Sequence, residues 1–227
     1  MPANAGGVVR MKLQLNKAHY PVTALGPGRR IGIWTQGCSI HCPGCVSLDT
    51  WKTDRSKAIE VDELIAWCKR VCGGVTEGIT ISGGEPFDQP KALGALLDGL
   101  IRWRRASGQA FDILCYSGYR LEKLRKEHDR LLARIDALIC DPYVDSLATE
   151  RPWRGSDNQR LVPLTPVGQE RYGAFVDAAG DEPKRFQVVA DGQRIWFVGI
   201  PHRGDLDRIE QACAERGVSL AATSWRA

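Results

Sequence analysis

Short apolar runs alternate with helical apolar patterns between residues 31 and 140, and this alternation restricts the fold of the chain more than any other feature. The apolar runs lie at 31–34, 78–82, 111–116 and 137–140. In the segments between them, apolar residues recur three and four positions apart, as on one face of a helix. Strands joined through helices form a parallel sheet with right-handed crossovers. The alternation therefore predicts an α/β fold with a mostly parallel sheet.

The same periodicities give the expected elements along the whole chain. Helices are expected at 61–72, 90–101, 119–134, 166–179 and 206–216. Further strands are expected at 11–20, near Leu161, and at 185–190, 194–200 and 218–220. The dipeptide Asp191-Gly192 favours a tight hairpin turn. The first ten residues, rich in Ala and Gly, are expected to be mobile.

Length and charge exclude several classes of protein. A chain of 227 residues with 43% apolar residues is long enough for one full core and a small appended unit. The net charge of +4 is modest and the Arg residues are scattered, which argues against nucleic-acid binding. No stretch approaches the roughly 20 apolar residues of a membrane span, and the start lacks a secretory pattern, so we expect a cytoplasmic protein.

Three of the eight Cys residues fall within one short segment, at Cys38, Cys42 and Cys45. Pro43 and Gly44 give that segment the tight curvature that would point the sulfurs inward. Three thiolates leave one coordination position open, as suits an iron–sulfur cube whose remaining iron binds an external ligand. A zinc site completed by His41 or by a distant Cys is the alternative.

A second motif, Ser82-Gly83-Gly84-Glu85-Pro86, follows the expected strand at 78–82. The carboxyl ends of parallel strands are where α/β folds place their ligands. Glycine lets backbone approach a bound molecule closely, and Glu85 offers a carboxylate to a cationic group. Taken alone, the two glycines could simply form a turn.

The motif Cys-x-x-x-Cys-x-x-Cys followed by Gly-Gly-Glu-Pro resembles the radical S-adenosylmethionine superfamily. Further segments are similar to the anaerobic ribonucleotide reductase activating proteins, a glycyl-radical activase family: 26–28, 34–38, 42–45, 50–51, 116–119 and 153–159. The resemblance covers about residues 26 to 161. It divides the chain into an N-terminal segment (1–25), a radical S-adenosylmethionine core (26–161) and an extension (162–227) packed on that core.

The resemblance implies a partial (β/α) barrel that holds one [4Fe-4S] cluster through Cys38, Cys42 and Cys45. It implies that S-adenosylmethionine binds the fourth iron and contacts Gly44, Cys45, Val46, Ser82, Gly83 and Gly84. Glu85 would help hold the methionine amino group, and Ser117 could reach the ribose. Asp141, at the end of a later strand, is a further candidate for cofactor or substrate contact.

The chemistry implied by the resemblance is the reductive cleavage of S-adenosylmethionine to methionine and a 5'-deoxyadenosyl radical. In activating proteins this radical takes a hydrogen atom from a glycine of a partner enzyme. A flavodoxin or ferredoxin would supply the electron. The chain departs from the family at Val46-Ser47, where Tyr-Asn is frequent, at Asp141-Pro142, where Asp-Gly is expected, and in its extension.

The extension leaves a second function open, a radical enzyme that modifies a small molecule or a peptide. A noncatalytic zinc-binding module is the third. The remaining Cys residues point to a single cluster, because Cys68 and Cys72 lie on an apolar helix face and Cys115, Cys140 and Cys213 are isolated. Arg154, Asn158, Gln159 and Arg160 could contact phosphate or a partner, or could cap the backbone of their own loop.

Overall fold

The computed structural model describes residues 11–178, 186–191 and 194–226 of the chain. Its strands are β1 (Lys12–Val22), β2 (Arg30–Thr35), β3 (Ala58–Glu60), β4 (Gly78–Gly83), β5 (Asp112–Tyr116), β6 (Ala137–Cys140), β7 (Arg160–Pro163), β8 (Phe186–Asp191) and β9 (Arg194–Gly199). Its α-helices are α1 (Val61–Val71), α2 (Pro90–Ser107), α3 (Leu121–Leu132), α4 (Pro166–Tyr172) and α5 (Asp205–Ala214). None of the described helices is both long and apolar enough to cross a lipid bilayer.

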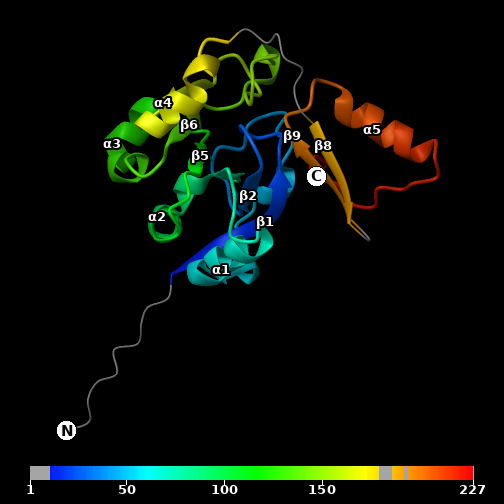
Figure 1. Ribbon diagram of the computed structural model, residues 1–227. Coiled ribbons are helices and arrows are strands. Elements are labelled where there is room, and N and C mark those ends of the chain that lie inside the picture. The colour runs from blue at the N-terminus through cyan, green and yellow to red at the C-terminus, as the bar shows by residue number, and fades with distance from the viewer. Residues whose placement is uncertain (1–10, 179–185, 192–193, 227) are drawn as a thin grey trace.

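Seven strands form one sheet in the order β3-β1-β2-β4-β5-β6-β7, and β8 and β9 form a separate hairpin (Figure 1). The four central strands, β2, β4, β5 and β6, run parallel to one another. The flanking strands β1, β3 and β7 pair antiparallel. Because β3 and β7 are edges, the sheet is an open, partial barrel. The α/β class with a parallel core, expected from the alternation, is confirmed.

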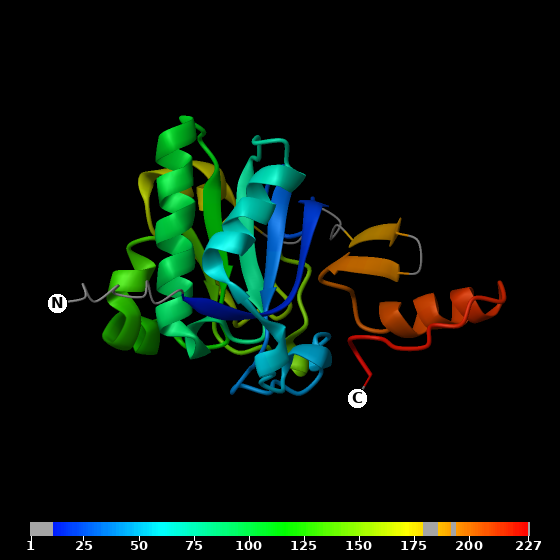
Figure 2. The same cartoon turned by 90° about the horizontal axis from the view of Figure 1, so that it is seen from below.

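Alternate residues of the central strands face two separate apolar layers, as the strand period of two requires. Ile31, Ile33, Ile79 and Ile81 point toward α1, α2 and α3 and form the larger core. Leu114, Ala137 and Ile139 point to the opposite face, where Tyr172 of α4 covers them. Figure 2 shows α1 and α2 on one face of the sheet and the hairpin with α5 beside β1. We call the face away from α1–α3 the inner face.

A fully buried ion pair crosses the inner face. The Arg30 guanidinium donates to both oxygens of Asp112, at 3.0 and 2.7 Å, and to the Thr80 hydroxyl at 2.7 Å. Asp112 also accepts from the Tyr172 hydroxyl and pairs with Arg171. These contacts connect β2, β4, β5 and α4, so the pair fixes how the helix from the extension sits against the sheet.

The hairpin of the extension packs against β1 and β2. Val198 is buried with Val22, Leu25 and Trp34, and the Trp196 ring stacks on His19 with centroids 4.7 Å apart. The Gln187 amide bonds the backbone of β1 and of the residue that follows it. Residues 12–22, which precede the expected start of the core, supply a strand of the same sheet.

Several expected elements differ from the structure in ways that have local causes. The helix expected at 166–179 ends at Tyr172, and Arg154 takes up the carbonyls of Phe175 and Val176 in the short turn that follows. The strand expected at 218–220 is an unpaired segment of the described chain, because Gly217 (φ +72°) lies in the turn that follows α5 and Val218 N–H bonds the Cys213 carbonyl. The short strand β3 had no recognisable pattern. Residues 1–10, 179–185 and 192–193, including Gly192 of the expected turn, lie outside the described residues.

We predict that Asp112→Asn lowers the free energy of unfolding of the cluster-free protein by about 3–5 kcal/mol, because it leaves the buried Arg30 charge without its counter-ion. Urea denaturation followed by circular dichroism measures this. The matched control is Asp98→Asn, which removes a half-exposed ion pair with Arg134 and should cost less than about 1 kcal/mol. Equal losses of unfolding free energy for the two substitutions would contradict the role of Asp112 as the counter-ion of Arg30.

Candidate functional site

The three-Cys loop leaves the carboxyl end of β2 and is closed at its base by backbone hydrogen bonds. Gly37 N–H bonds the Thr50 carbonyl at 2.7 Å, and Cys38 N–H bonds the Trp51 carbonyl at 3.0 Å. The Gln36 amide, 2% exposed, donates to the carbonyls of Asp49 and Lys52. The segment from Cys38 to Thr50, which we call the ligand loop, therefore has both of its ends fixed against one another.

A tight turn brings the second and third Cys together. Cys45 N–H bonds the Cys42 carbonyl at 3.1 Å, with Pro43 and Gly44 in between. Gly44 has φ +78°, a left-handed conformation that favours glycine. Proline followed by a positive-φ glycine is the pattern of a type II turn. The curvature expected from Pro43 and Gly44 is thus present.

All three thiols are free and partly exposed. Each sulfur accepts backbone N–H groups: Cys38 from Ile40 and His41, Cys42 from Tyr143, and Cys45 from Ser47 at 3.4 Å. Burial raises the pKa of Cys38 and of Cys42, and the nearby Cys45 raises both further. Such N–H groups would stabilise metal-bound thiolates and influence the potential of a cluster.

Three unpaired soft thiols on one loop are the donor set that iron–sulfur clusters use, so the residues present fit the expected cluster. Across residues 11–178, 186–191 and 194–226, no group of three or more His, Cys, Asp or Glu side chains, these three thiols included, converges on one metal ion, so the fit to a cluster rests on the type and spacing of the donors.

The diglycine turn at the end of β4 lies directly against the base of the ligand loop. Gly84 N–H bonds the Thr35 carbonyl at 2.9 Å, and Glu85 N–H bonds the Gly37 carbonyl at 2.8 Å. A β-carbon on Gly83 (φ +104°) would collide with the backbone of Thr35, and one on Gly84 would collide with that of Gly37. Both glycines are therefore required by this crossing of two backbones, a reason independent of any ligand.

Glu85 is 1% exposed, and its carboxylate is engaged within the protein. It accepts from Phe87 N–H at 3.0 Å, from the Ser117 hydroxyl at 2.9 Å and from Gly118 N–H at 2.7 Å. Burial raises the pKa of Glu85 to about 7, against the lowering effect of these donors. The carboxylate thus connects the end of β4 to the segment after β5.

Ser117 and Asp141 follow β5 and β6, so they share the carboxyl edge of the sheet with the ligand loop and the diglycine turn. The Ser117 hydroxyl donates to Glu85. Asp141, with φ +82°, accepts from Arg160 on both oxygens, at 2.6 and 3.0 Å. The sequence-predicted site residues therefore lie along one edge, with the side chains of Ser117, Glu85 and Asp141 already bonded to protein groups.

Tyr143 is a site residue that sequence reasoning missed. Its ring lies between two glycines: a β-carbon on Gly155 would lie 2.9 Å from Tyr143 Cδ2, and one on Gly44 3.2 Å from Cε1. Its N–H bonds the Cys42 sulfur and its hydroxyl donates to Asp145 at 2.9 Å. Tyr143 thus holds the ligand loop against the connection that follows β6. Only its place just after Asp141 could have indicated this.

The polar residues at 154–160 form hydrogen bonds and ion pairs with other groups of the protein. Gln159 accepts from Gly155 N–H and Ser156 N–H, and Asn158 donates to the Pro142 carbonyl. Arg154 is 2% exposed and bonds backbone carbonyls, while Arg160 pairs with Asp141 and Glu122. Capping of the loop's own backbone thus describes the contacts of Asn158 and Gln159, whereas Arg154 bonds the turn after α4 and Arg160 bonds two carboxylates.

The remaining candidates have packing roles. Cys68 and Cys72 are buried in the larger core, as their helical spacing predicted. Cys115 and Cys140 are also buried, on β5 and β6. His41 stacks on Trp51 with ring centroids 4.6 Å apart, and His128 lies against Phe87.

Comparison with known families agrees with this geometry. Residues 24–162, which include the ligand loop, the diglycine turn and Ser117, match the family described as the 4Fe-4S single cluster domain. The chain belongs to this family. The family description supports an iron–sulfur cluster in this part of the chain.

Curated proteins that are similar to this chain include named activating proteins. The anaerobic ribonucleoside-triphosphate reductase-activating protein of Escherichia coli K12 is 32% identical over 152 residues, covering 62% of this chain and 93% of that protein. Its counterpart in Enterobacteria phage T4 is 29% identical over 137 residues, covering 60% and 85%. The pyruvate formate-lyase-activating enzyme of Staphylococcus aureus is 31% identical over 144 residues, covering 59% and 57%. The resemblance to radical S-adenosylmethionine activating enzymes is confirmed.

We predict that Glu85 makes the stability of the cluster-free protein depend on pH. Its pKa is about 7 in the folded chain and 4.5 ordinarily, so the folded state holds the proton more tightly. The free energy of unfolding should then fall as pH rises from about 4.5 to about 7, by at most about 3 kcal/mol, and level off above.

Urea denaturation across this pH range measures how the free energy of unfolding changes with pH. Glu85→Gln should remove the decrease that is due to Glu85, whatever the substitution does to stability at a single pH. The control is Glu122→Gln: Glu122 is exposed, and its ion pair with Arg160 lowers its pKa to about 2. That substitution should alter the profile only below about pH 4.5. An unchanged slope in Glu85→Gln would contradict the prediction.

Proposed function

We propose that the protein binds one [4Fe-4S] cluster through Cys38, Cys42 and Cys45 and cleaves S-adenosylmethionine reductively, to generate a glycyl radical on a partner enzyme. The observation that carries this proposal is the bonding of the diglycine turn to the base of the ligand loop, through Gly84 N–H and Glu85 N–H. It joins the two motifs at the carboxyl edge of the sheet, where a small cofactor could bridge them.

In this proposal S-adenosylmethionine contacts the following residues: Gly44, Cys45, Val46, Ser82, Gly83, Gly84, Glu85, Ser117 and Asp141. When bound, the reduced cluster supplies one electron, which breaks the sulfonium carbon–sulfur bond to give methionine and a 5'-deoxyadenosyl radical. The chain's own part is to hold the thiolates with backbone N–H groups and to position the cofactor. Glu85 would bind the methionine amino group and, as it does here, support the Ser117 segment.

The partner in this proposal is a glycyl-radical enzyme, as the names of the activating relatives suggest. The radical would take one hydrogen atom from a backbone glycine, leaving 5'-deoxyadenosine and the glycyl radical. A flavodoxin or ferredoxin would be the electron donor, and the cytoplasm the compartment.

One observation favours a second candidate, a radical enzyme that acts on a small molecule or a peptide. The extension and the core line a half-open cavity of about 850 Å³. Trp34, Val46 and Ser47 line it from the core, and Trp196 and Phe197 line it from the extension. Because Val46 and Ser47 directly follow Cys45, a substrate in this cavity would lie next to the ligand loop.

We predict that Cys38→Ser, Cys42→Ser and Cys45→Ser each reduce iron content and 5'-deoxyadenosine formation to background, because each removes one of three thiolate ligands. Anaerobic reconstitution, iron analysis and product assay with S-adenosylmethionine and a reductant measure this. Cys213→Ser on α5 is the control and should retain both. Zinc without iron in the anaerobically purified protein would instead support the noncatalytic zinc module.

Electron paramagnetic resonance on the full chain separates the two radical functions. A glycine-centred signal on a candidate partner protein, dependent on S-adenosylmethionine and on Cys38, is expected for the activase. Consumption of S-adenosylmethionine that a small-molecule or peptide fraction stimulates, with no protein radical formed, would support the second function instead.

A further inference from the structure

A residue of the C-terminal tail bonds the ligand loop directly. The Ser224 carbonyl accepts from Leu48 N–H at 2.7 Å and from Asp49 N–H at 3.4 Å. The Ser224 hydroxyl donates to the Val46 carbonyl at 3.2 Å, across 178 positions of sequence. Each of the three contacts is with a residue one to four positions after Cys45.

The N–H groups of Leu48 and Asp49, which donate to the Ser224 carbonyl, would otherwise have no capping acceptor. Leu48–Thr50 form a single 3-10 turn, and Ser47 before it provides no side-chain hydrogen bond. The first N–H groups of any helical turn have no partner within the turn. Ser224 therefore supplies the cap, and it does so with backbone from the far end of the described chain.

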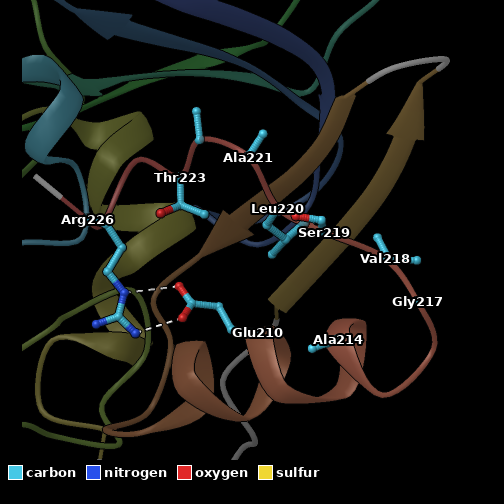
Figure 3. Close-up of a pocket in the computed structure, with 10 residues that line it drawn as sticks. Glu210, Ala214, Gly217, Val218, Ser219, Leu220, Ala221, Thr223 and Arg226 are labelled. Carbon is cyan, nitrogen blue, oxygen red and sulfur yellow. Dashed lines mark hydrogen bonds and ion pairs between the residues drawn. The ribbon is translucent and has the colours of Figure 1, made fainter.

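The tail is itself held in place by α5 and the hairpin. The Trp225 indole donates to Glu210 at 2.5 Å, and its ring packs nearly perpendicular to that of Phe197, with centroids 5.6 Å apart. Figure 3 shows the Arg226 guanidinium against the Glu210 carboxylate; it also pairs with Asp207 at 2.8 Å. These contacts fix the two residues that follow Ser224.

The hairpin is in turn anchored to the core, so the tail is positioned by the sheet. Trp196 stacks on His19 and Gln187 bonds the Pro21 carbonyl. A second link runs from Arg203 to Asp145 at 3.5 Å, and Asp145 accepts from Tyr143, which contacts Gly44. The extension thus reaches the segment after the Cys42–Cys45 turn directly, through Ser224, and the turn itself indirectly, through Asp145 and Tyr143.

We propose that residues 224–226, which we call the tail strap, are a positioning element for the ligand loop. Ser224 holds Val46–Asp49 in the conformation that lets Ser47 N–H bond the Cys45 sulfur. The proposal rests on the proposed function, because the strap would position Cys45, the third cluster ligand, and Val46, a proposed cofactor contact. The strap touches no reacting atom, so Ser224 is a positioning residue.

Amide hydrogen exchange on the cluster-free protein tests the contact without any cofactor. In a chain truncated after Thr223, the amides of Leu48 and Asp49 should exchange about tenfold faster than in the full chain. The amides of Ile79 and Ile81 in β4 are the internal control and should be unchanged. Unchanged exchange at Leu48 and Asp49 would overturn the proposal, as would an equal rise in β4.

A single substitution tests the proposal even if the truncation unfolds the extension. Ser224→Ala removes the bond to the Val46 carbonyl and keeps the backbone bonds, and Thr223→Ala is its neighbouring control in the same tail. After reconstitution, Ser224→Ala should lose iron to a chelator about fivefold faster than Thr223→Ala. Equal rates of iron loss would overturn the proposal.

The same samples separate this proposal from the proposed function. The proposed function fails if the full chain holds no iron or does not cleave S-adenosylmethionine. The tail contact still stands in that case if the truncation speeds amide exchange at Leu48 and Asp49. If the full chain is active and the truncated chain matches it in exchange, iron retention and cleavage, the strap has no positioning role.

Discussion

The contact on which the site depends is the crossing of two backbones at the carboxyl edge of the sheet. The turn after β4 donates N–H groups to the carbonyls of Thr35 and Gly37, at the base of the ligand loop. This approach is possible only because Gly83 and Gly84 carry no β-carbon. The ligand loop, the diglycine turn and, through the carboxylate of Glu85, the segment after β5 are thereby joined into one unit.

The inner face of the sheet is closed from two directions by parts of the chain that follow β7. On one side α4 places Tyr172 against the Arg30–Asp112 pair, which is buried and fully hydrogen-bonded. On the other side the hairpin covers Trp34, the residue of β2 that lies four positions before Cys38. Aromatic rings and the residues that follow Cys45 line the cavity between the hairpin, the tail and the ligand loop.

The sequence was sufficient for the parallel core and for the position of both motifs. Ile31, Ile33, Ile79 and Ile81 alternate, and the helices between them repeat every three or four residues, so local periodicity alone located these elements. It could not locate contacts between segments far apart in sequence. The roles of Tyr143 and Ser224 depend on which distant glycine or N–H group lies opposite, and the carbonyls in the turn after α4 are bonded by the arginine at position 154. The internal hydrogen bonds of Glu85 were missed for the same reason, since the motif suggested a ligand for that carboxylate.

The long sequence separation between the ligand loop and its cap also bears on how the protein is made. During synthesis on the ribosome, Cys38, Cys42 and Cys45 emerge well before Ser224, which is 178 residues beyond Val46. The nascent loop can form its Cys42–Cys45 turn at once, but the cap on Leu48 and Asp49 has to wait for translation to reach the tail. The hydrogen bonds between the tail and Val46, Leu48 and Asp49 can therefore form only after the strands of the sheet have been translated.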